Sequence, residues 1–185
     1  MVPLTALWLP IVVATIVVFV VSSVLHMFLT YHYDDFRKAP QEDAVLAALR
    51  GLNLPPGDYA LPKADSMQQM RSPEFRERVQ RGPRAVLSVA PAGMAMGASL
   101  MQWFVYLLVV GVLCAYISGR ELAHGANYLA VFRIVGFTAF VAYAMALPQA
   151  SIWYQRSWRL TVAAMFDGLV FGLLTAGIFG WLWPR

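Results

Sequence analysis

The sequence is poor in charged residues and in cysteine. Only 13% of its 185 residues are charged and 59% are hydrophobic, whereas ordinary soluble domains have about 25% charged residues. This balance argues against a soluble globular domain. The single cysteine, Cys114, lies in an apolar stretch and has no partner for a disulfide within the chain. It therefore predicts core packing and leaves the redox compartment open.

Charge is absent from most of the length of the chain. Seventeen of the 24 charged residues lie within residues 34–84, and the rest of the chain carries only seven. Four apolar segments, at 4–30, 98–118, 126–147 and 160–183, each reach the ~20 residues that a helix needs to cross a bilayer. The first segment has no basic region before it and no cleavage site after it, which argues against a signal peptide.

These apolar segments predict an all-α integral membrane protein with four transmembrane helices. Residues 1–30 form the first helix, 31–97 a polar segment with short helices, and 98–185 the other three helices with short loops. Short loops favour an antiparallel bundle. Lysine and arginine are concentrated in residues 31–97 and 148–159, so the positive-inside rule predicts a cytoplasmic 31–97 segment and both termini outside. A bacterial inner membrane is the expected location.

The polar segment carries signals for local structure. Residues 39–51 predict a short helix that ends at Gly51, because glycine suits the position after a last turn. Residues 72–82 predict a second helix with Ser72 as its N-cap. Residues 85–93 predict a short strand, an interfacial stretch or a re-entrant piece, because the proline and glycine in this stretch oppose a continuous helix.

Recognisable catalytic motifs are also lacking. The sequence contains no Walker loop, no Gly-rich dinucleotide motif, no G-x-S-x-G and no HExxH. The sequence therefore predicts no catalytic residue and no metal site, and it argues against an enzyme. It leaves any cofactor unknown. The net charge of +4 does not predict nucleic-acid binding, because a basic excess on one side of a membrane explains it.

Two ionisable residues lie inside the predicted spans, Arg133 and Asp167. Such residues are functional candidates by default. In a simple hairpin of the third and fourth spans their Cα atoms are ~12 Å apart along the membrane normal, so no salt bridge between them is predicted. Arg133 is expected to reach the headgroups. Asp167 is expected to meet the Tyr143 hydroxyl, an arginine of the inner loop or water, or to serve as a proton or cation site.

A ridge of small residues along the last span is the strongest pattern in the chain. Small residues four positions apart let the backbone of a second helix approach closely. The second span has a weaker version in Gly111, Ala115 and Gly119. Both patterns predict helix packing, either within this chain or with another. The ridge of the last span consists of Ala164, Gly168, Gly172, Ala176 and Gly180.

His26 and a basic run are the remaining candidates. His26 is the one histidine within a predicted span, and His32 lies six residues on, away from the same helical face. His26 is a possible haem or metal ligand, but a haem in a bundle takes two ligands from facing helices. The basic run predicts attraction to anionic lipid headgroups, with docking of a cytoplasmic protein as the rival. The run consists of Arg71, Arg76, Arg78, Arg81 and Arg84.

Three functions are compatible with these patterns. The leading hypothesis is a non-catalytic structural, assembly or accessory subunit of a membrane complex, or a homo-oligomer, whose partners are the lipid bilayer and a membrane protein or a second copy of itself. The first alternative is a small-solute or proton-coupled transporter or channel that uses Asp167. The second is a haem or redox subunit that uses His26.

Overall fold

The computed structural model describes residues 1–32, 36–91, 93 and 95–185. The chain divides into two compact units. The first, which we call the helical unit, combines Met1–Arg37 with Met96–Arg185, and the second, the polar unit, is Lys38–Ala95. The helical unit therefore holds all four apolar segments, and the polar unit holds most of the charged residues.

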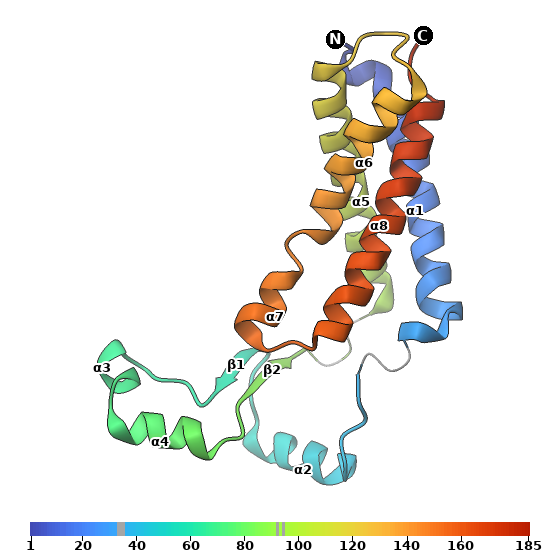
Figure 1. Cartoon of the computed structure of the whole chain (residues 1–185). Helices are drawn as coiled ribbons and strands as arrows, with labels where there is room; N and C mark the ends of the chain where they lie inside the picture. The colour runs from blue at the N-terminus through green and yellow to red at the C-terminus, as the bar shows by residue number, and fades with distance from the viewer. Residues whose placement is uncertain (33–35, 92, 94) are drawn as a thin grey trace. The chain divides into compact units, whose positions relative to one another are not determined.

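Four helical segments in the described part of the chain are long and apolar enough to cross a membrane. This confirms the prediction of four long apolar helices. A short turn, η1 (Leu4–Leu7), leads into the first of them. The helices of this unit are α1 (Trp8–Phe28), α5 (Met96–Glu121), α6 (Tyr128–Ala144), α7 (Pro148–Tyr154) and α8 (Trp158–Trp181), as shown in Figure 1.

The third apolar segment differs from its predicted bounds of 126–147. Helix α6 already ends at Ala144, and Pro148 begins the short helix α7. Proline suits the first position of a helix because its missing N–H would have no partner there. The proline therefore starts a helix, and α6 and α7 together make one apolar segment, Tyr128–Tyr154.

Helices α6 and α8 pack against each other along their length (Figure 1). The ridge of small residues makes this contact. A Cβ added at Gly172 would lie 3.2 Å from the backbone nitrogen of Phe140, and one added at Gly180 would lie 2.7 Å from the ring of Tyr128. The start of α6 thus lies at the end of α8, so these two helices run in opposite directions. The partner of the ridge is a helix of the same chain.

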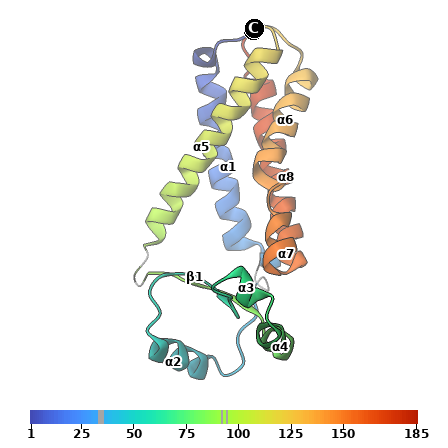
Figure 2. The ribbon, with the colours of Figure 1, turned by 90° about the vertical axis from the view of Figure 1, so that its left-hand side faces the viewer.

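The weaker ridge of small residues in α5 packs against the N-terminal part of the chain, and Figure 2 shows α5 crossing α1. A Cβ added at Gly111 would lie 3.3 Å from a methyl group of Ile11. Further along, the N–H of Val2 donates a hydrogen bond of 2.7 Å to the carbonyl oxygen of Gly119. Glycine is required there because an added Cβ would lie 2.6 Å from the carbonyl oxygen of Val2.

Both ends of the chain lie at the same end of the helical unit (Figure 1). The N–H of Gly125 donates to the carbonyl oxygen of Pro184 at 2.9 Å, which ties the C-terminal residues to the loop between α5 and α6. The interior between the helices is filled by fully buried apolar side chains. They include Leu107, Val110, Val131, Val135 and Phe179.

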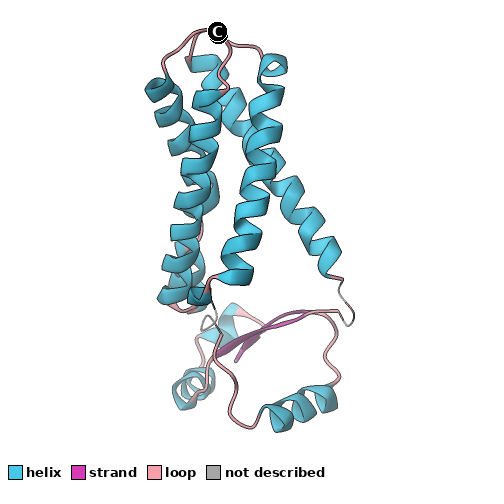
Figure 3. Cartoon of the chain, turned by 90° about the vertical axis from the view of Figure 1, so that its right-hand side faces the viewer, coloured by secondary structure: helices cyan, strands magenta, loops and turns pink. Residues whose placement is uncertain are grey.

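The polar unit is built from short elements, and Figure 3 shows its paired strands. The two strands are antiparallel, with Gly57 opposite Val89 and Tyr59 opposite Leu87. Residues Ala85–Val89 form a strand, which is one of the three structures predicted for 85–93. The elements are α2 (Glu42–Leu52), β1 (Gly57–Leu61), α3 (Met67–Met70), α4 (Pro73–Arg81) and β2 (Ala85–Val89).

The ends of the two longer helices in the polar unit test the predicted capping residues. The prediction for α4 is confirmed, because the Ser72 hydroxyl accepts a hydrogen bond of 3.1 Å from the N–H of Phe75. The predicted end of α2 at Gly51 is wrong. The helix continues through Leu52, and Asn53 adopts the left-handed conformation that ends it, with φ of 49°. Asparagine tolerates this conformation better than most residues because its short side chain bonds locally.

The polar unit lacks a core of its own. None of its described side chains is buried, although several large apolar ones are present. Leu52 is 64% exposed and Val86 is 53% exposed. Folding of a unit this small is ordinarily stabilised by apolar burial, and the described residues of the polar unit show little of it.

Candidate functional site

Asp167 is a buried carboxylate in the first half of α8. It is 4% exposed, although it sits on an otherwise apolar helix. An ionised carboxylate in such surroundings is costly unless donors or cations face it. The groups that face it come from the last turn of α1 and from a short turn, η2 (Thr30–His32), directly after it.

Tyr31 and His32 provide two of these groups. The hydroxyl of Tyr31 donates a hydrogen bond to Oδ1 of Asp167. Nε2 of His32 lies 2.9 Å from Oδ2 of the same carboxylate. Each carboxylate oxygen thus has its own partner. The hydrogen-bond donor is therefore Tyr31, with His32 at ion-pair distance, and among the described contacts of Asp167 there is none with Tyr143, the residue that the sequence suggested.

His26 provides the third group, from the last turn of α1. Its Nε2 lies 4.0 Å from Oδ2 of Asp167. Its other ring nitrogen, Nδ1, lies 2.8 Å from the carbonyl oxygen of Ser22. Because a carbonyl oxygen can only accept, Nδ1 carries a proton, and in the neutral ring the lone pair is then on Nε2, the nitrogen nearer to the carboxylate.

The backbone of α1 brings the two histidines together by ending between them. Leu29 is extended, with ψ of 127°, and the chain turns back into η2. The imidazole rings of His26 and His32 consequently stack, with centroids 4.5 Å apart and an angle of 9° between the planes. A spacing of six residues would separate them on a continuous helix, which is why their proximity was not predicted.

A second layer of hydrogen bonds holds the turn of α1 that carries His26. The indole N–H of Trp103, on α5, donates to the hydroxyl of Ser22 at 2.9 Å. That hydroxyl donates in turn to the carbonyl oxygen of Phe19 at 2.9 Å. Ser22 is therefore fixed on both sides, and its own carbonyl oxygen orients the ring of His26. Such outer partners commonly set the tautomer of a ligating histidine.

The cluster of His26, His32 and Asp167 has the composition of a metal site. One ligand atom from each of the three residues lies within 4.8 Å of the other two. Two imidazoles and one carboxylate suit Zn²⁺ and the neighbouring divalent transition metals. Two ligands of a tetrahedral zinc ion are about 3.3 Å apart for bonds of ~2.0 Å. The distance between His32 and Asp167 is shorter and that between His26 and Asp167 longer. Because the two stacked rings are nearly parallel, one of them would also have to turn before both Nε2 atoms could bind the same ion.

The other residues singled out in the sequence lie elsewhere. Arg133 is exposed, and the described residues show no ion pair between it and Asp167. Cys114 is fully buried among core side chains. All five arginines of the basic run are exposed and belong to the polar unit. The ridge of small residues lies at the contact of α8 with α6 and reports packing there.

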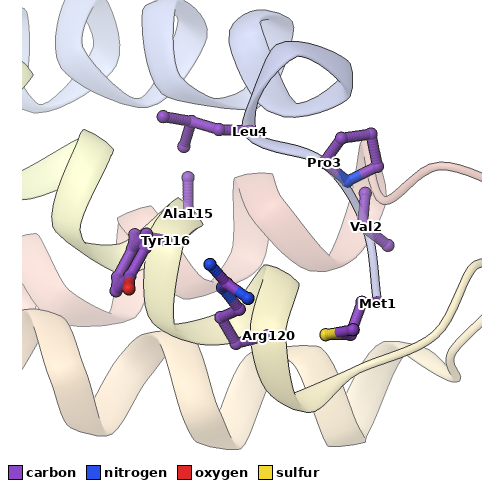
Figure 4. Close-up of a pocket in the computed structure, with 7 residues that line it drawn as sticks. All are labelled: Met1, Val2, Pro3, Leu4, Ala115, Tyr116 and Arg120. Carbon is purple, nitrogen blue, oxygen red and sulfur yellow. The ribbon is translucent and has the colours of Figure 1, made fainter.

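A cavity of about 410 Å³ opens at the other end of the helical unit, between the N-terminal residues and α5. Figure 4 shows its lining side chains. Arg120 is the charged side chain among them, and its guanidinium carbon lies 5.5 Å from the ring centroid of Tyr116. None of the residues that line this cavity belongs to the cluster around Asp167.

The chain was compared with known proteins by family, sequence and structure. No family model matches it, and neither a curated protein nor a solved structure does.

Proposed function

We propose that the protein is an integral membrane protein whose four spans form an antiparallel bundle. The apolar length of the helices supports insertion, and the opposite directions of α6 and α8 support the bundle. The distribution of lysine and arginine supports a cytoplasmic polar unit with both termini outside. A bacterial inner membrane fits this composition.

We further propose that the protein binds a divalent transition-metal ion at His26, His32 and Asp167, close to the cytoplasmic face. One observation carries this proposal: a buried carboxylate faces the Nε2 atoms of two histidines at 2.9 and 4.0 Å. The Tyr31 hydroxyl orients the carboxylate, and the Ser22 carbonyl oxygen orients one imidazole. Outer partners of this kind are typical of metal centres.

The other hypotheses derived from the sequence gain less from the geometry. Haem ligation by His26 needs a second imidazole on the opposite side of the iron, whereas His32 stacks beside His26. The transporter hypothesis uses the same site, because it also depends on Asp167. It predicts a flux of solute or protons that Asp167→Asn abolishes. The role of an accessory or assembly subunit is favoured by the polar unit, because its apolar side chains lack a core. Self-association through the ridge loses its basis, since α6 covers it.

A titration with Co²⁺ tests the metal site. The full-length protein is purified in detergent, treated with a chelator and titrated while the visible absorption of Co²⁺ in a low-symmetry protein site is recorded. We expect saturation at one equivalent and displacement by Zn²⁺. His32→Ala and Asp167→Asn should weaken binding by at least about tenfold, because even outer-partner losses have effects of that size.

The third histidine of the chain supplies a matched control. His124 lies in the loop between α5 and α6, away from the cluster, so His124→Ala should bind Co²⁺ like the unaltered protein. Asp167→Asn keeps an amide oxygen that accepts from Tyr31, and thermal unfolding verifies that this variant folds. The metal proposal is refuted if the unaltered protein shows no saturable binding of Co²⁺. If Asp167→Asn also melts at a lower temperature, the cluster stabilises the fold through its hydrogen bonds instead.

A further inference from the structure

One helix of the polar unit, α4, places basic side chains beside an apolar stripe. Helix α4 carries two apolar side chains, Phe75 and Val79, which are half-buried within the unit. At 3.6 residues per turn they lie about 40° apart and form one narrow stripe. Arg76 and Arg78 flank this stripe, each about 60° from the nearer apolar residue. Both arginines are exposed.

The two acidic residues of α4 lie outside the apolar stripe, and Glu74 is about 120° from the centre of the stripe, next to Arg78. Glu77 is centred about 180° from the apolar stripe, and its carboxylate accepts a hydrogen bond of 2.6 Å from Arg81. That ion pair neutralises one arginine of the basic run. Among the described residues, Arg76 and Arg78 have no acidic partner. The unneutralised positive charge therefore lies beside the apolar stripe, and the paired charge lies away from it.

This arrangement is the one expected of a helix at a membrane surface. An apolar stripe enters the headgroup region, and arginines at its edges extend to lipid phosphates while their stems stay in apolar surroundings. Anionic headgroups attract each basic residue near the surface. A protein partner would need acidic side chains in the matching positions, whereas the bilayer provides phosphates at every position along the helix.

The covalent connections of the polar unit keep it near a bilayer. Ala95, its last residue, directly precedes α5, and Arg84 is twelve residues before Met96. A fully extended chain of that length spans at most about 42 Å. Since the tether is short, the local concentration of lipid headgroups around α4 is high, and a weak affinity suffices for binding.

We propose that α4 docks on anionic lipid headgroups, with Phe75 and Val79 toward the bilayer and with Arg76 and Arg78 on the phosphates. This inference rests on the proposed insertion of the four spans and is independent of the metal site. The occupant is the bilayer surface of the protein's own membrane. Docking would cover the part of Phe75 and Val79 that the polar unit leaves exposed.

Hydrogen exchange of the full-length protein in nanodiscs tests the docking. The rates of α4 amides are compared in discs of phosphatidylcholine alone and of phosphatidylcholine mixed with phosphatidylglycerol. We expect exchange about tenfold slower in the anionic discs, from the combined attraction of the two arginines. The difference should vanish at 1 M salt, where the screening length is about 3 Å. The amides of α2 serve as an internal reference.

Matched arginine variants separate docking from general effects. The double variant Arg76→Gln, Arg78→Gln should lose the lipid dependence, whereas Arg81→Gln, on the paired side, should keep most of it. Protection of β1 amides confirms that each variant keeps its fold. Equal exchange of α4 in both kinds of disc refutes the docking, as does protection that appears only with a co-purified protein. Failure of the chain to enter nanodiscs at all would instead refute the proposed insertion.

Discussion

The helical unit and the polar unit differ most in where their apolar side chains lie. In the helical unit, Phe179 and Leu107 are buried between helices, and glycines let the backbones approach closely. In the polar unit, Leu52 and Val86 remain more than half exposed. The helical unit is therefore stabilised by packing within the chain. The polar unit relies on local hydrogen bonds and leaves much of its apolar surface exposed. Equivalent substitutions should have very different effects in the two units.

The largest difference is expected when a large apolar side chain is truncated in each unit. Phe179 is completely buried, so Phe179→Ala should lower the free energy of unfolding by about 3–5 kcal/mol through the cavity it leaves. Leu52→Ala should change it by no more than about 0.5 kcal/mol. Unfolding in detergent micelles, followed by tryptophan fluorescence, measures the first, because all six tryptophans lie in the helical unit. Hydrogen exchange of the polar-unit amides measures the second. Similar losses for the two variants would show that the polar unit has a core after all.

A smaller difference is expected between two glycines of the same helix. A Cβ at Gly172 would lie 3.2 Å from a backbone nitrogen of α6, whereas one at Gly177 would meet its nearest atom, the hydroxyl of Tyr128, at 3.6 Å. Gly172→Ala should therefore cost about 1–3 kcal/mol by overpacking. Gly177→Ala should be neutral or stabilise by up to about 1 kcal/mol, because alanine favours helix.

Thermal unfolding of the two glycine variants gives the comparison directly. An equal shift of the melting temperature for both would contradict the close packing of α8 on α6. A lower melting temperature for Gly177→Ala alone would show that α6 contacts a different side of α8.

The smallest expected effect is a titration in the polar unit. The pKa of Glu74 lies below its usual value of 4.5, first because its own backbone N–H donates to the carboxylate and then because the Ser72 hydroxyl does. A lowered pKa in the folded state contributes stability above pH 4.5, and this contribution is lost as the pH falls through the folded value. The N-terminal end of α4 should therefore loosen only in acid, below pH 4.5.

Carboxyl NMR of the labelled protein measures this titration. The midpoint for Glu74 should lie below 4.5 and should rise toward that value in Ser72→Ala, which removes one of the two donors. A midpoint at or above 4.5 in the unaltered protein, or one that Ser72→Ala leaves unchanged, would contradict the capping interaction.

The parts of the fold that depend on local chemistry could be predicted from the sequence. Apolar length predicts the four long helices, and the Ser-Pro pair at 72–73 predicts the start of α4. The end of α2 was missed because the geometry of the last turn, not the presence of glycine, decides which residue turns left-handed. The predicted third segment stopped at residue 147, before Pro148, whereas proline can also begin a helix and here begins α7.

The candidate site could be predicted only in part. Asp167 stands out because an acid in an apolar span needs a partner. Its partners could not be named, since Tyr31 and His32 lie beyond the end of α1 and helical spacing does not apply there. The one available signal was the pair of histidines near the end of the first predicted span, at the same end of the predicted bundle as the acid. For the ridge of small residues in α8, the sequence predicted helix packing but could not identify the partner helix.

The turn η2 has a mechanical consequence. Lys38, the first residue of the polar unit, follows His32 by six residues along the chain. Any force on the polar unit from that side reaches Tyr31 and His32 before it reaches the long helix α1. The contacts of Asp167 with Tyr31 and His32 thus hold this connection to α8, and their strength decides how far a pull on the polar unit reaches into the helical unit.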